Sequence, residues 1–472
     1  MLIDEFRVRG GLSKEQIDLM HEKALYLIEH SGIKIPHEGI KKRLAEYDGV
    51  RIESDKVMFR SDLVLRALKD AVYDVPEYAK DNWIISAGAH QTAFYDWDSG
   101  KLREPTSEDL VDLIKLGDGL DTVGSAPVIP MDVPVHLQHI LMHKVAYEHS
   151  RYRCNDIYEH MDKPSYECAK YVFEMAEAAG KRKAFGIWMI SPKSFDRMNL
   201  EIAYRLLDEG VPMWVATMPV AGVAAPITMI GAVLQSIYEH FAGLTMLHLI
   251  NTGANNYISP NDAFEADPFD MKFSTFVYGS VEYIRHTLYQ IPLCAYYDIP
   301  VMTKTLLTTS KEPDAHAAFE IGMHTLIAAL MGARAFRCGG LLSTGEIYCA
   351  EQVVIVHEIV EYIKQLLKKE EFSEDRLFID EILTVEPGKS FAGLKSTLRL
   401  FRQEYWEPAL FTHSNLGQWS EMGAKSLRQC AREIARKKIE EQSYQAEDDV
   451  RRELEKIYRR AERDKQLEDS FK

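Results

Sequence analysis

Apolar and polar positions switch between helical and strand spacing most clearly over residues 191–260. Apolar residues recur at three- and four-residue steps through Ile230, Leu234 and Phe241, which is typical of a helix with one buried face. We expect this helix to begin at Pro226. Proline has no backbone N–H, and at the first position of a helix that N–H would have no partner within the helix. The apolar run MWVATM precedes it and reads as a strand. The segment therefore predicts alternating helices and strands.

The same alternation extends over residues 106–370. Eight short apolar runs are predicted strands, and helical segments separate most of them: 123–129, 152–157, 184–190, 213–218, 255–258, 275–278, 301–303 and 335–338. Alternating strands and helices form either a barrel or an open doubly wound sheet. No GxGxxG motif follows the first strand, and this motif is the main sequence signature of a dinucleotide-binding open sheet. The pattern favours an α/β fold of the (β/α)8 TIM barrel type.

Two flanking regions differ from this pattern. Residues 1–105 predict a small α+β N-terminal domain that begins with a helix over 12–31. Ser13 and Gln16 are expected to form a capping box at the start of this helix. Residues 371–472 predict a helical C-terminal extension that ends in a long, highly charged helix from about 424 to 464. Few large apolar residues lie on that helix, which is typical of an exterior or inter-subunit element. We therefore divide the chain into 1–105, 106–370 and 371–472.

Composition narrows the class of protein. The 472 residues are 46% hydrophobic and carry a net charge of −16, which argues against a nucleic-acid surface. No apolar run is long enough to span a membrane, and no signal peptide is evident at the start of the sequence. The six cysteines are scattered without a CxxC pair, as expected of reduced thiols. These features predict a cytoplasmic protein with no nucleic-acid or membrane partner.

Several phrases occur in an order that resembles a known family. They are SPKSFD, MPVAGVAAPITMIGA, TSKEPDAHAAFEIG, CGGLLSTGEIYCAEQVVIVHEI and LRLFRQEYWEP, with LSKEQIDLMHEKALYLIEHSGIKI and WDSGKLREPTSEDL before them. Together they resemble the trimethylamine methyltransferase family over nearly the whole chain. The resemblance implies a TIM barrel that transfers a methyl group from an amine to Co(I) of a separate corrinoid protein. It also implies that this chain binds no cofactor tightly, because the corrinoid (cobalamin) belongs to the partner.

One departure from the family pattern bears on the substrate. The founding enzymes of the family carry pyrrolysine in the region that matches 335–345, whereas this chain has FRCGGLLSTG at 336–345. The chain therefore resembles the branch without pyrrolysine, whose members demethylate quaternary amines. The resemblance implies proline betaine first, then glycine betaine, carnitine and γ-butyrobetaine, with a homo-oligomer as the expected assembly and an anaerobic host.

A quaternary ammonium sets clear demands on its site. It already bears positive charge, so loss of a methyl group expels a neutral amine and needs no general acid. Aromatic faces hold such cations by cation–π attraction, and a TIM barrel places its site at the carboxyl ends of its strands. Three or four of the aromatic residues near those ends are expected to form the cage, although any single ring fits barrel packing as well: Phe94, Tyr95, Trp188, Trp214, Tyr257, Tyr278, Phe336 and Tyr348.

A betaine also has a carboxylate, which calls for a cationic side chain opposite the cage. The candidates are Arg337, Lys304 and His160, each near the end of a predicted strand. Arg337 fits equally well as a buried partner of an acidic residue. Glu346, in the loop after the last predicted strand, is a weak catalytic candidate that could face the ammonium, or it is a solvated loop carboxylate.

Two other functions remain open from the sequence. His136, His139 and His143 fall at steps of three and four on one predicted helix and could bind zinc, as in a zinc-dependent barrel hydrolase. No HExxH motif or cysteine joins them, so we expect no metal site. A non-catalytic betaine-binding protein on the same fold is the second alternative, because it would keep the aromatic cage and lose methyl transfer.

Overall fold

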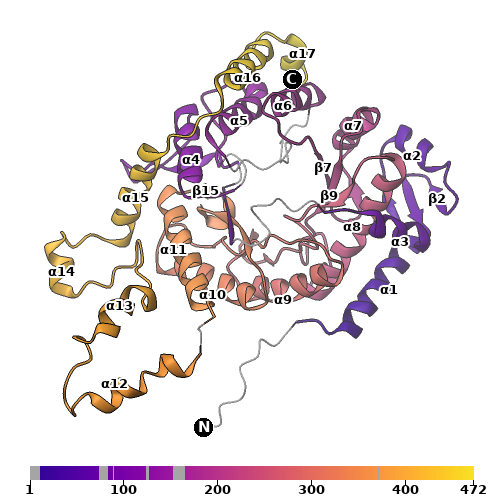
Figure 1. The fold of residues 1–472 in the computed structure, drawn as a ribbon. Helices are drawn as coiled ribbons and strands as arrows, with labels where there is room; N and C mark the ends of the chain where they lie inside the picture. The colour runs from indigo at the N-terminus through magenta and orange to yellow at the C-terminus, as the bar shows by residue number, and fades with distance from the viewer. Residues whose placement is uncertain are drawn as a thin grey trace.

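The computed structural model describes residues 11–73, 83–88, 90–123, 127–151, 165–369 and 372–471. Strands lie inside a surrounding layer of helices, and the chain ends on an outer helix (Figure 1). Within the described ranges no helix has both the length and the apolar character that a bilayer crossing needs. The fold is mixed α/β, as the sequence predicts.

The N-terminal region forms a small α+β layer. Ser13 caps α1 and exchanges hydrogen bonds with Gln16, which confirms the predicted capping box. Strand β1 joins this layer to the main sheet, because it pairs with β3 on one side and with β8 on the other. The elements are α1 (Lys14–His30), β1 (Ile33–Lys34), α2 (Glu38–Leu44), β2 (Val50–Glu53), β3 (Lys56–Phe59), α3 (Ser61–Asp70) and β8 (Ser194–Phe195).

Parallel strands form the centre of the molecule. Strand β9 (Met213–Thr217) pairs in parallel with both β7 (Phe185–Ile190) and β10 (Tyr257–Ile258). A second parallel pair joins β13 (Ala335–Gly339) to β4 (Ile84–Ala87). By their hydrogen bonds these two groups are separate sheets.

Shorter contacts link the two groups of strands. Thr303 makes a parallel bridge to Phe336 on β13, and the Met302 N–H donates to the Pro260 carbonyl beyond β10. On the other side, Ser86 on β4 bridges in parallel to Val123. Parallel pairings thus join β7, β9 and β10 in one group and the Thr303 segment, β13, β4 and Val123 in another, and the Met302–Pro260 hydrogen bond connects the two groups. The predicted strand over 152–157 lies outside the described residues, so closure into an eight-stranded barrel stays a proposal.

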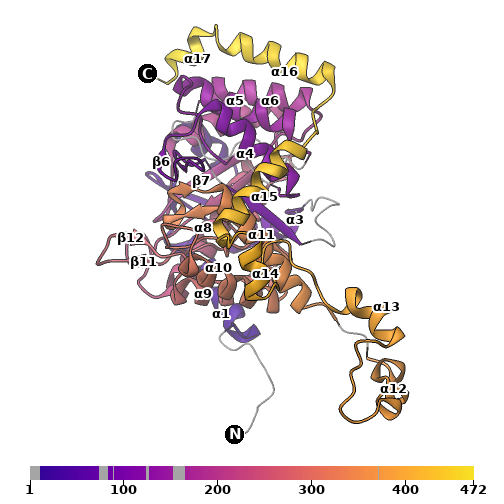
Figure 2. The same ribbon diagram turned by 90° about the vertical axis from the view of Figure 1, so that its left-hand side faces the viewer.

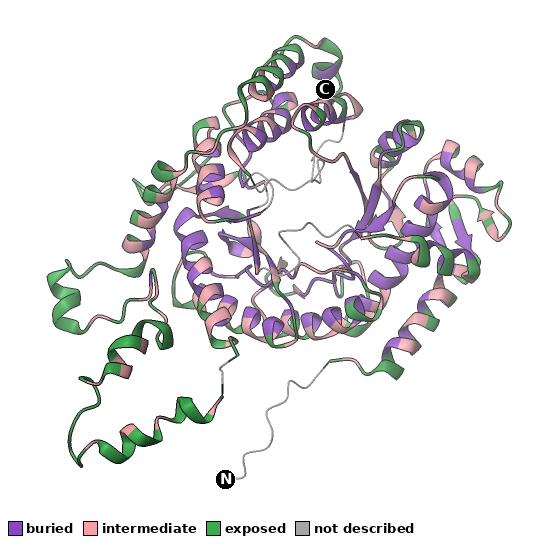
Figure 3. Cartoon of the chain, viewed as in Figure 1, coloured by how far each residue is buried: buried purple, intermediate pink, exposed green. Residues whose placement is uncertain are grey.

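Helices pack around these strands. Buried residues concentrate on β7, β9 and the inward sides of the helices (Figure 3). The helices are α4 (Ser107–Gly119), α5 (Val135–His149), α6 (Tyr166–Ala178), α7 (Arg197–Leu206), α8 (Met229–Ile250), α9 (Val281–Tyr296), α10 (Ala315–Leu330) and α11 (Ala350–Leu366). A small sheet beside them contains β5 (Ala93–Tyr95), β6 (Leu102–Arg103), β14 (Leu341–Leu342) and β15 (Ile347–Tyr348).

Three elements differ from the sequence prediction. Residues 275–278 are not a barrel strand, because β12 (Thr275–Phe276) pairs antiparallel with β11 (Phe269–Asp270) in a separate hairpin. Helix α8 begins at Met229 and not at Pro226, since the Thr228 side chain accepts the Gly231 N–H and caps the helix there. The charged C-terminal helix is divided, with helix breaks after residues 441 and 461.

The C-terminal region has two parts. Residues 372–426, which we call the arm, contain α12 (Ile379–Thr384), α13 (Lys395–Glu404) and α14 (Leu416–Glu421), and no residue of these three described helices is buried. Helices α12 and α13 extend away from the body (Figure 2), whereas Leu410 and Phe411, before α14, pack against α11. The remainder returns to the body as α15 (Leu427–Glu441), α16 (Asp448–Ala461) and α17 (Lys465–Asp469).

Alternation along the central strands sorts their side chains into two faces. On β7, Ile187 and Met189 join the apolar core beneath the helices, whereas Trp188 lies in a separate cluster with Trp214 of β9. Successive residues of a strand point to opposite faces, so Trp188 and Trp214 occupy the face turned away from that core.

Candidate functional site

Charged side chains gather at the carboxyl ends of the parallel strands. We call them the charged cluster: Asp262, Glu265 and Asp267 follow β10, Lys304 follows the Thr303 bridge, and Arg337 lies on β13. Backbone hydrogen bonds fix the first of these segments, because the Asp267 N–H donates to Pro219 and the Asp267 carbonyl accepts from Ala221. The segments after β9 and β10 are thereby held together.

Ion pairs connect the members of the cluster. Arg337 Nη2 lies 2.5 Å from Asp262 Oδ1 and 3.5 Å from Glu265 Oε2. Lys304 Nζ lies 3.8 Å from Glu265 Oε2 and 3.7 Å from Asp267 Oδ1. The structure therefore brings Lys304 and Arg337 together, as two candidates for one site, and gives Arg337 the acidic partner that the sequence left open.

Two tyrosines complete the surroundings of the acids. The Tyr283 hydroxyl donates to Glu265 Oε1 at 2.6 Å, and the Tyr278 hydroxyl donates to Asp267 Oδ2 at 3.3 Å. Lys304 Nζ lies 5.5 Å from the centre of the Tyr278 ring, a cation–π distance. Tyr278 is thus a cage candidate that contacts the charged cluster directly.

The pKa values of the two buried acids Glu265 and Asp267 are shifted in opposite directions. Burial raises the pKa of Asp267 to about 6, and the Glu265 charge adds to the rise. Burial also acts to raise the pKa of Glu265, but the charges of Lys304, His286 and Arg337 outweigh it and hold that pKa below its usual value. The pKa of Lys304 is raised, because Asp267 and Glu265 outweigh the effect of its burial. Lys304 is therefore charged at neutral pH.

Several polar atoms of the cluster have unused hydrogen-bonding capacity. Glu265 Oε2, Asp267 Oδ1 and Arg337 Nε are buried without a hydrogen-bond partner among the described residues. The hydrogen-bond contact recorded for Lys304 Nζ is to Met218 Sδ, at 3.8 Å. Buried polar groups are normally paired, so such orphaned atoms indicate a site that receives a polar ligand or water. Burial lowers the pKa of His286, which leaves its ring neutral near pH 7. With Asp267 ionised, the three carboxylates of the cluster then face two cations, Lys304 and Arg337, and the net charge is −1.

An aromatic cluster occupies the inner face of the neighbouring strands. Trp188 and Trp214 meet edge to face, with ring centres 6.1 Å apart, and Tyr257 of β10 packs with them. Gly186 makes room for this arrangement, because a Cβ atom there would overlap the Trp214 indole. We call Trp188, Trp214 and Tyr257 the aromatic cluster.

The two clusters are carried by neighbouring strands. Tyr257 begins β10, whose following segment supplies the acids, and Trp188 lies toward the carboxyl end of β7 opposite Ala216. The guanidinium of Arg182 lies 5.4 Å from the Tyr257 ring centre, so that ring already faces a cation. Trp188 is therefore the member of the aromatic cluster best placed near the strand ends where the acids lie.

Sequence comparison assigns the chain to a family. A family model described as trimethylamine methyltransferase (MTTB) matches residues 2–465. The chain belongs to the trimethylamine methyltransferase family.

Individual relatives of this family member are distant in sequence. The chain is 23% identical to glycine betaine methyltransferase of Desulfitobacterium hafniense over 87% of its own length and 88% of the relative. It is 24% identical to trimethylamine methyltransferase MttB2 of Methanosarcina mazei over 89% and 88% of the two chains. Among solved structures, monomethylamine methyltransferase of Methanosarcina barkeri aligns with a TM-score of 0.46 at 10% identity, covering 92% of this chain and 89% of that one.

The other aromatic candidates of this trimethylamine methyltransferase family member lie elsewhere. Phe336 packs against Trp83, on the face of β13 opposite to Arg337. Phe94 and Tyr348 are buried in the same core, which places them among packing residues. Tyr95 lies beneath Arg428, whose guanidinium is 5.3 Å from the ring centre.

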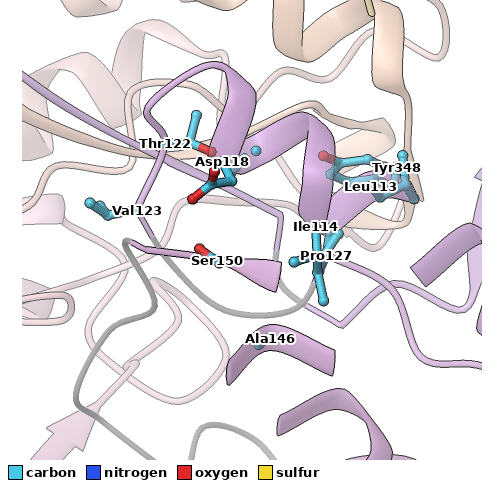
Figure 4. Close-up of a pocket in the computed structure, with 11 residues that line it drawn as sticks. Leu113, Ile114, Asp118, Thr122, Val123, Pro127, Ala146, Ser150 and Tyr348 are labelled. Carbon is cyan, nitrogen blue, oxygen red and sulfur yellow. The ribbon is translucent and has the colours of Figure 1, made fainter. Parts of the chain in front are cut away.

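Tyr348 also borders a small cavity away from the charged cluster. The cavity measures about 20 Å³ and lies between α4, α5 and Ala87 at the end of β4, beside Asp118 and Thr122 (Figure 4). That volume is close to the space of a single water molecule. The cavity is therefore too small for a betaine.

The remaining candidates have no contact with the charged cluster in the described residues. Glu346 is exposed and its Oε2 accepts a hydrogen bond from the Ser343 hydroxyl at 2.6 Å. His160 lies outside the described residues. On α5, His143 Nδ1 lies 2.7 Å from the His139 carbonyl, and the His139 ring packs near His90 with ring centres 6.5 Å apart. No group of three possible metal ligands occurs in the described part of the chain.

The acids of the charged cluster and Tyr283 were not singled out from the sequence. A signal for them existed in SPNDAFEADPFD, which puts three carboxylates within six positions directly after a predicted strand. Most loop carboxylates are solvated, so the pattern alone does not distinguish this buried set from a surface loop.

Proposed function

We propose that this protein transfers one methyl group from a quaternary amine to Co(I) of a separate corrinoid protein. The observation that carries the proposal is the buried cluster of net charge −1 at the strand ends, with Tyr278 against it, in a chain of the trimethylamine methyltransferase family. Trp188 lies toward the carboxyl end of β7, on the same side of the sheet. Aromatic faces and a negative field both favour a quaternary ammonium. The corrinoid is a co-substrate carried by its own protein.

The chemistry asks little of the protein beyond binding and alignment. The carbon–nitrogen bond of the ammonium breaks with its electron pair left on nitrogen, giving a neutral tertiary amine. The cobalt supplies the pair for the new bond to the methyl carbon and is formally oxidised from Co(I) to Co(III). No proton moves, so the residues need to hold the cation, orient the carbon–nitrogen bond and exclude water.

Proline betaine is the first proposed substrate, followed by glycine betaine, carnitine and γ-butyrobetaine. Lys304 Nζ and Arg337 Nε make no hydrogen bond to a carboxylate among the described residues. Both groups can therefore donate hydrogen bonds to the carboxylate of a betaine. The similarity to a glycine betaine methyltransferase supports a betaine as the methyl donor. Glu346 stays a catalytic candidate from its place in the loop after β13, although its hydrogen bond is to the Ser343 hydroxyl.

A homo-oligomer in the cytoplasm completes the proposal, together with a closed barrel and the three-part division of the chain. The arm exposes Leu398 and Phe401 one turn apart on α13, and α10 exposes Phe319 and Met323 on the body. Short isolated helices are marginal in water, so α13 gains stability from a partner surface. We propose that the arm of one copy packs against a second copy.

The test is methyl transfer to Co(I) cobalamin and to a cognate corrinoid protein, followed by the absorbance of the corrinoid. The methyl donors are trimethylamine, choline, glycine betaine, proline betaine, carnitine and γ-butyrobetaine. We expect a methylated corrinoid with a betaine and none with trimethylamine. Failure with every donor, under conditions in which a known member of the family is active, would overturn the proposal.

The same preparation separates the alternatives. Calorimetric binding of a betaine without methyl transfer would identify a non-catalytic betaine-binding protein. Stoichiometric zinc in the purified protein, with hydrolytic activity lost on chelation, would identify the barrel hydrolase.

A further inference from the structure

An exposed apolar surface borders the charged cluster. We call it the rim patch: Val223, Ile227 and Ile230 lie in or just after the segment that follows β9, and Met271 and Phe273 lie in the hairpin that follows β10. Their exposed fractions are 61%, 68%, 38%, 54% and 69%. Apolar residues scattered singly on a surface are normal, whereas a contiguous patch marks an interaction site.

The two halves of the rim patch meet over one glycine. A Cβ atom at Gly222 would lie against both Ile227 Cδ1 and Met271 Cε, so these two side chains approach each other there. Gly222 has a φ of +80°, a conformation that glycine adopts without strain. Ile227 and Met271 therefore connect the apolar side chains of the two segments.

Backbone contacts place this surface at the charged cluster. The same two segments are joined through Asp267, which bonds to both Pro219 and Ala221. The β11–β12 hairpin projects from the body on the side opposite to α12 and α13 of the arm (Figure 2). A molecule that reaches the charged cluster from outside at the strand ends therefore passes beside the rim patch.

We propose that the rim patch is the docking surface for the corrinoid-carrying protein. This inference rests on the proposed function, because it takes the methyl acceptor to be a protein-bound corrinoid. The cores of protein interfaces are rich in aromatic residues and methionine, and the rim patch offers Phe273 and Met271 with aliphatic side chains around them. A second copy of this chain at the same place would cover the strand ends that the methyl acceptor must reach.

The experiment compares two acceptors, free Co(I) cobalamin and the cognate corrinoid protein, with the variants Phe273→Asp and Ile227→Asp. Leu19→Asp is the matched control, because Leu19 on α1 is 53% exposed and lies outside the rim patch. Removing a central apolar contact commonly costs an interface tenfold or more, so we expect kcat/KM for the corrinoid protein to fall at least about tenfold in each rim variant. The rate of methyl transfer to free cobalamin should stay within about twofold, because free cobalamin carries no protein that must dock on the rim patch.

Each other outcome has a definite meaning. Equal loss with both acceptors would overturn the inference, since the rim residues would then act on the site itself. No loss with either acceptor, or a change in subunit count by light scattering, would also overturn it. If the unaltered protein methylates neither acceptor, the proposed function fails first, and that result is distinguishable because it precedes any comparison of variants.

Discussion

Arg337 on β13 donates to Asp262 in the segment after β10 at 2.5 Å, which joins two neighbouring parts of the parallel layer through a buried ion pair. Arg337→Met would leave both Asp262 and Glu265 without this guanidinium. Removing one partner of a buried pair costs about 3–5 kcal/mol, so we expect a matching loss in the free energy of unfolding. Urea denaturation measures it.

The double variant Arg337→Met/Asp262→Asn provides the control for this prediction. It removes the uncompensated charge at position 262 and should recover part of the loss. Equal stability of the single variant and the unaltered protein would show that the pair contributes nothing to the fold.

Binding of a quaternary ammonium should depend on pH through Asp267. The pKa of this carboxyl is raised to about 6, so the site gains its negative charge as pH rises through that value. We expect kcat/KM for the methyl donor to rise over the same interval, and Asp267→Asn to remove the step. A step that persists in the variant would assign the titration to another group.

Stability has the opposite dependence on the same group. Because folding raises the pKa of Asp267, the contribution of its protonated form is complete below the ordinary aspartate value and is lost as pH rises through about 6. The unaltered protein should therefore lose stability relative to Asp267→Asn over that interval. Thermal melting of both proteins at several pH values measures the difference.

Trp188 should hold the substrate cation. Replacing its ring by Leu removes a cation–π contact, for which a tenfold rise in KM, about 1.4 kcal/mol, is the expected scale. Phe336→Leu is the matched control, since Phe336 packs on the opposite face and should change the melting temperature without changing KM. A rise in KM for the control and none for Trp188→Leu would contradict the assignment.

Lys304 should distinguish betaines from simple cations. Lys304→Met removes a donor for the substrate carboxylate, and a hydrogen bond between charged groups is worth about 1.5–3 kcal/mol, or roughly ten- to a hundredfold in kcat/KM. We expect that loss with proline betaine. Affinity for choline, which has no carboxylate, should not fall, because the site becomes more negative. Calorimetry measures the affinity for both ligands. An equal loss of affinity for proline betaine and for choline would argue for a structural role of Lys304.

The arm should carry self-association. Phe401→Asp places a charge on the exposed apolar face of α13, so we expect a lower mass in light scattering at the same protein concentration. Leu19→Asp on α1 serves again as the control. An unchanged mass would remove the arm from the interface.

The sequence predicts the elements of this fold better than their partners. The capping box at Ser13 and Gln16 depends on local residues, and it forms as expected. Residues 275–278 read TFVY, which suits any strand, and only long-range pairing with β11 decides that they form a hairpin. Pro226 and Thr228 are both acceptable at a helix start, and the hydrogen bond from Gly231 decides in favour of Thr228.

In the candidate site, too, single residues can be predicted from the sequence better than their partners can. Lys304, Arg337 and Trp188 can be named from their positions at strand ends. Their partners cannot, because burial of Glu265 and Asp267 results from packing between segments that are distant along the chain. The pKa of Asp267 depends on that burial first, which no local pattern encodes.

Gly186 and Trp214 are coupled in a way that bears on how the protein can be altered. The indole fills the space that any side chain at position 186 would need, so position 186 cannot gain a side chain while Trp214 keeps its ring. Attempts to reshape the inner wall one position at a time will fail at 186, however mild the replacement. Pairing Gly186→Ala with a smaller ring at 214 opens a route that single substitutions close, and libraries aimed at new methyl donors should vary the two positions jointly.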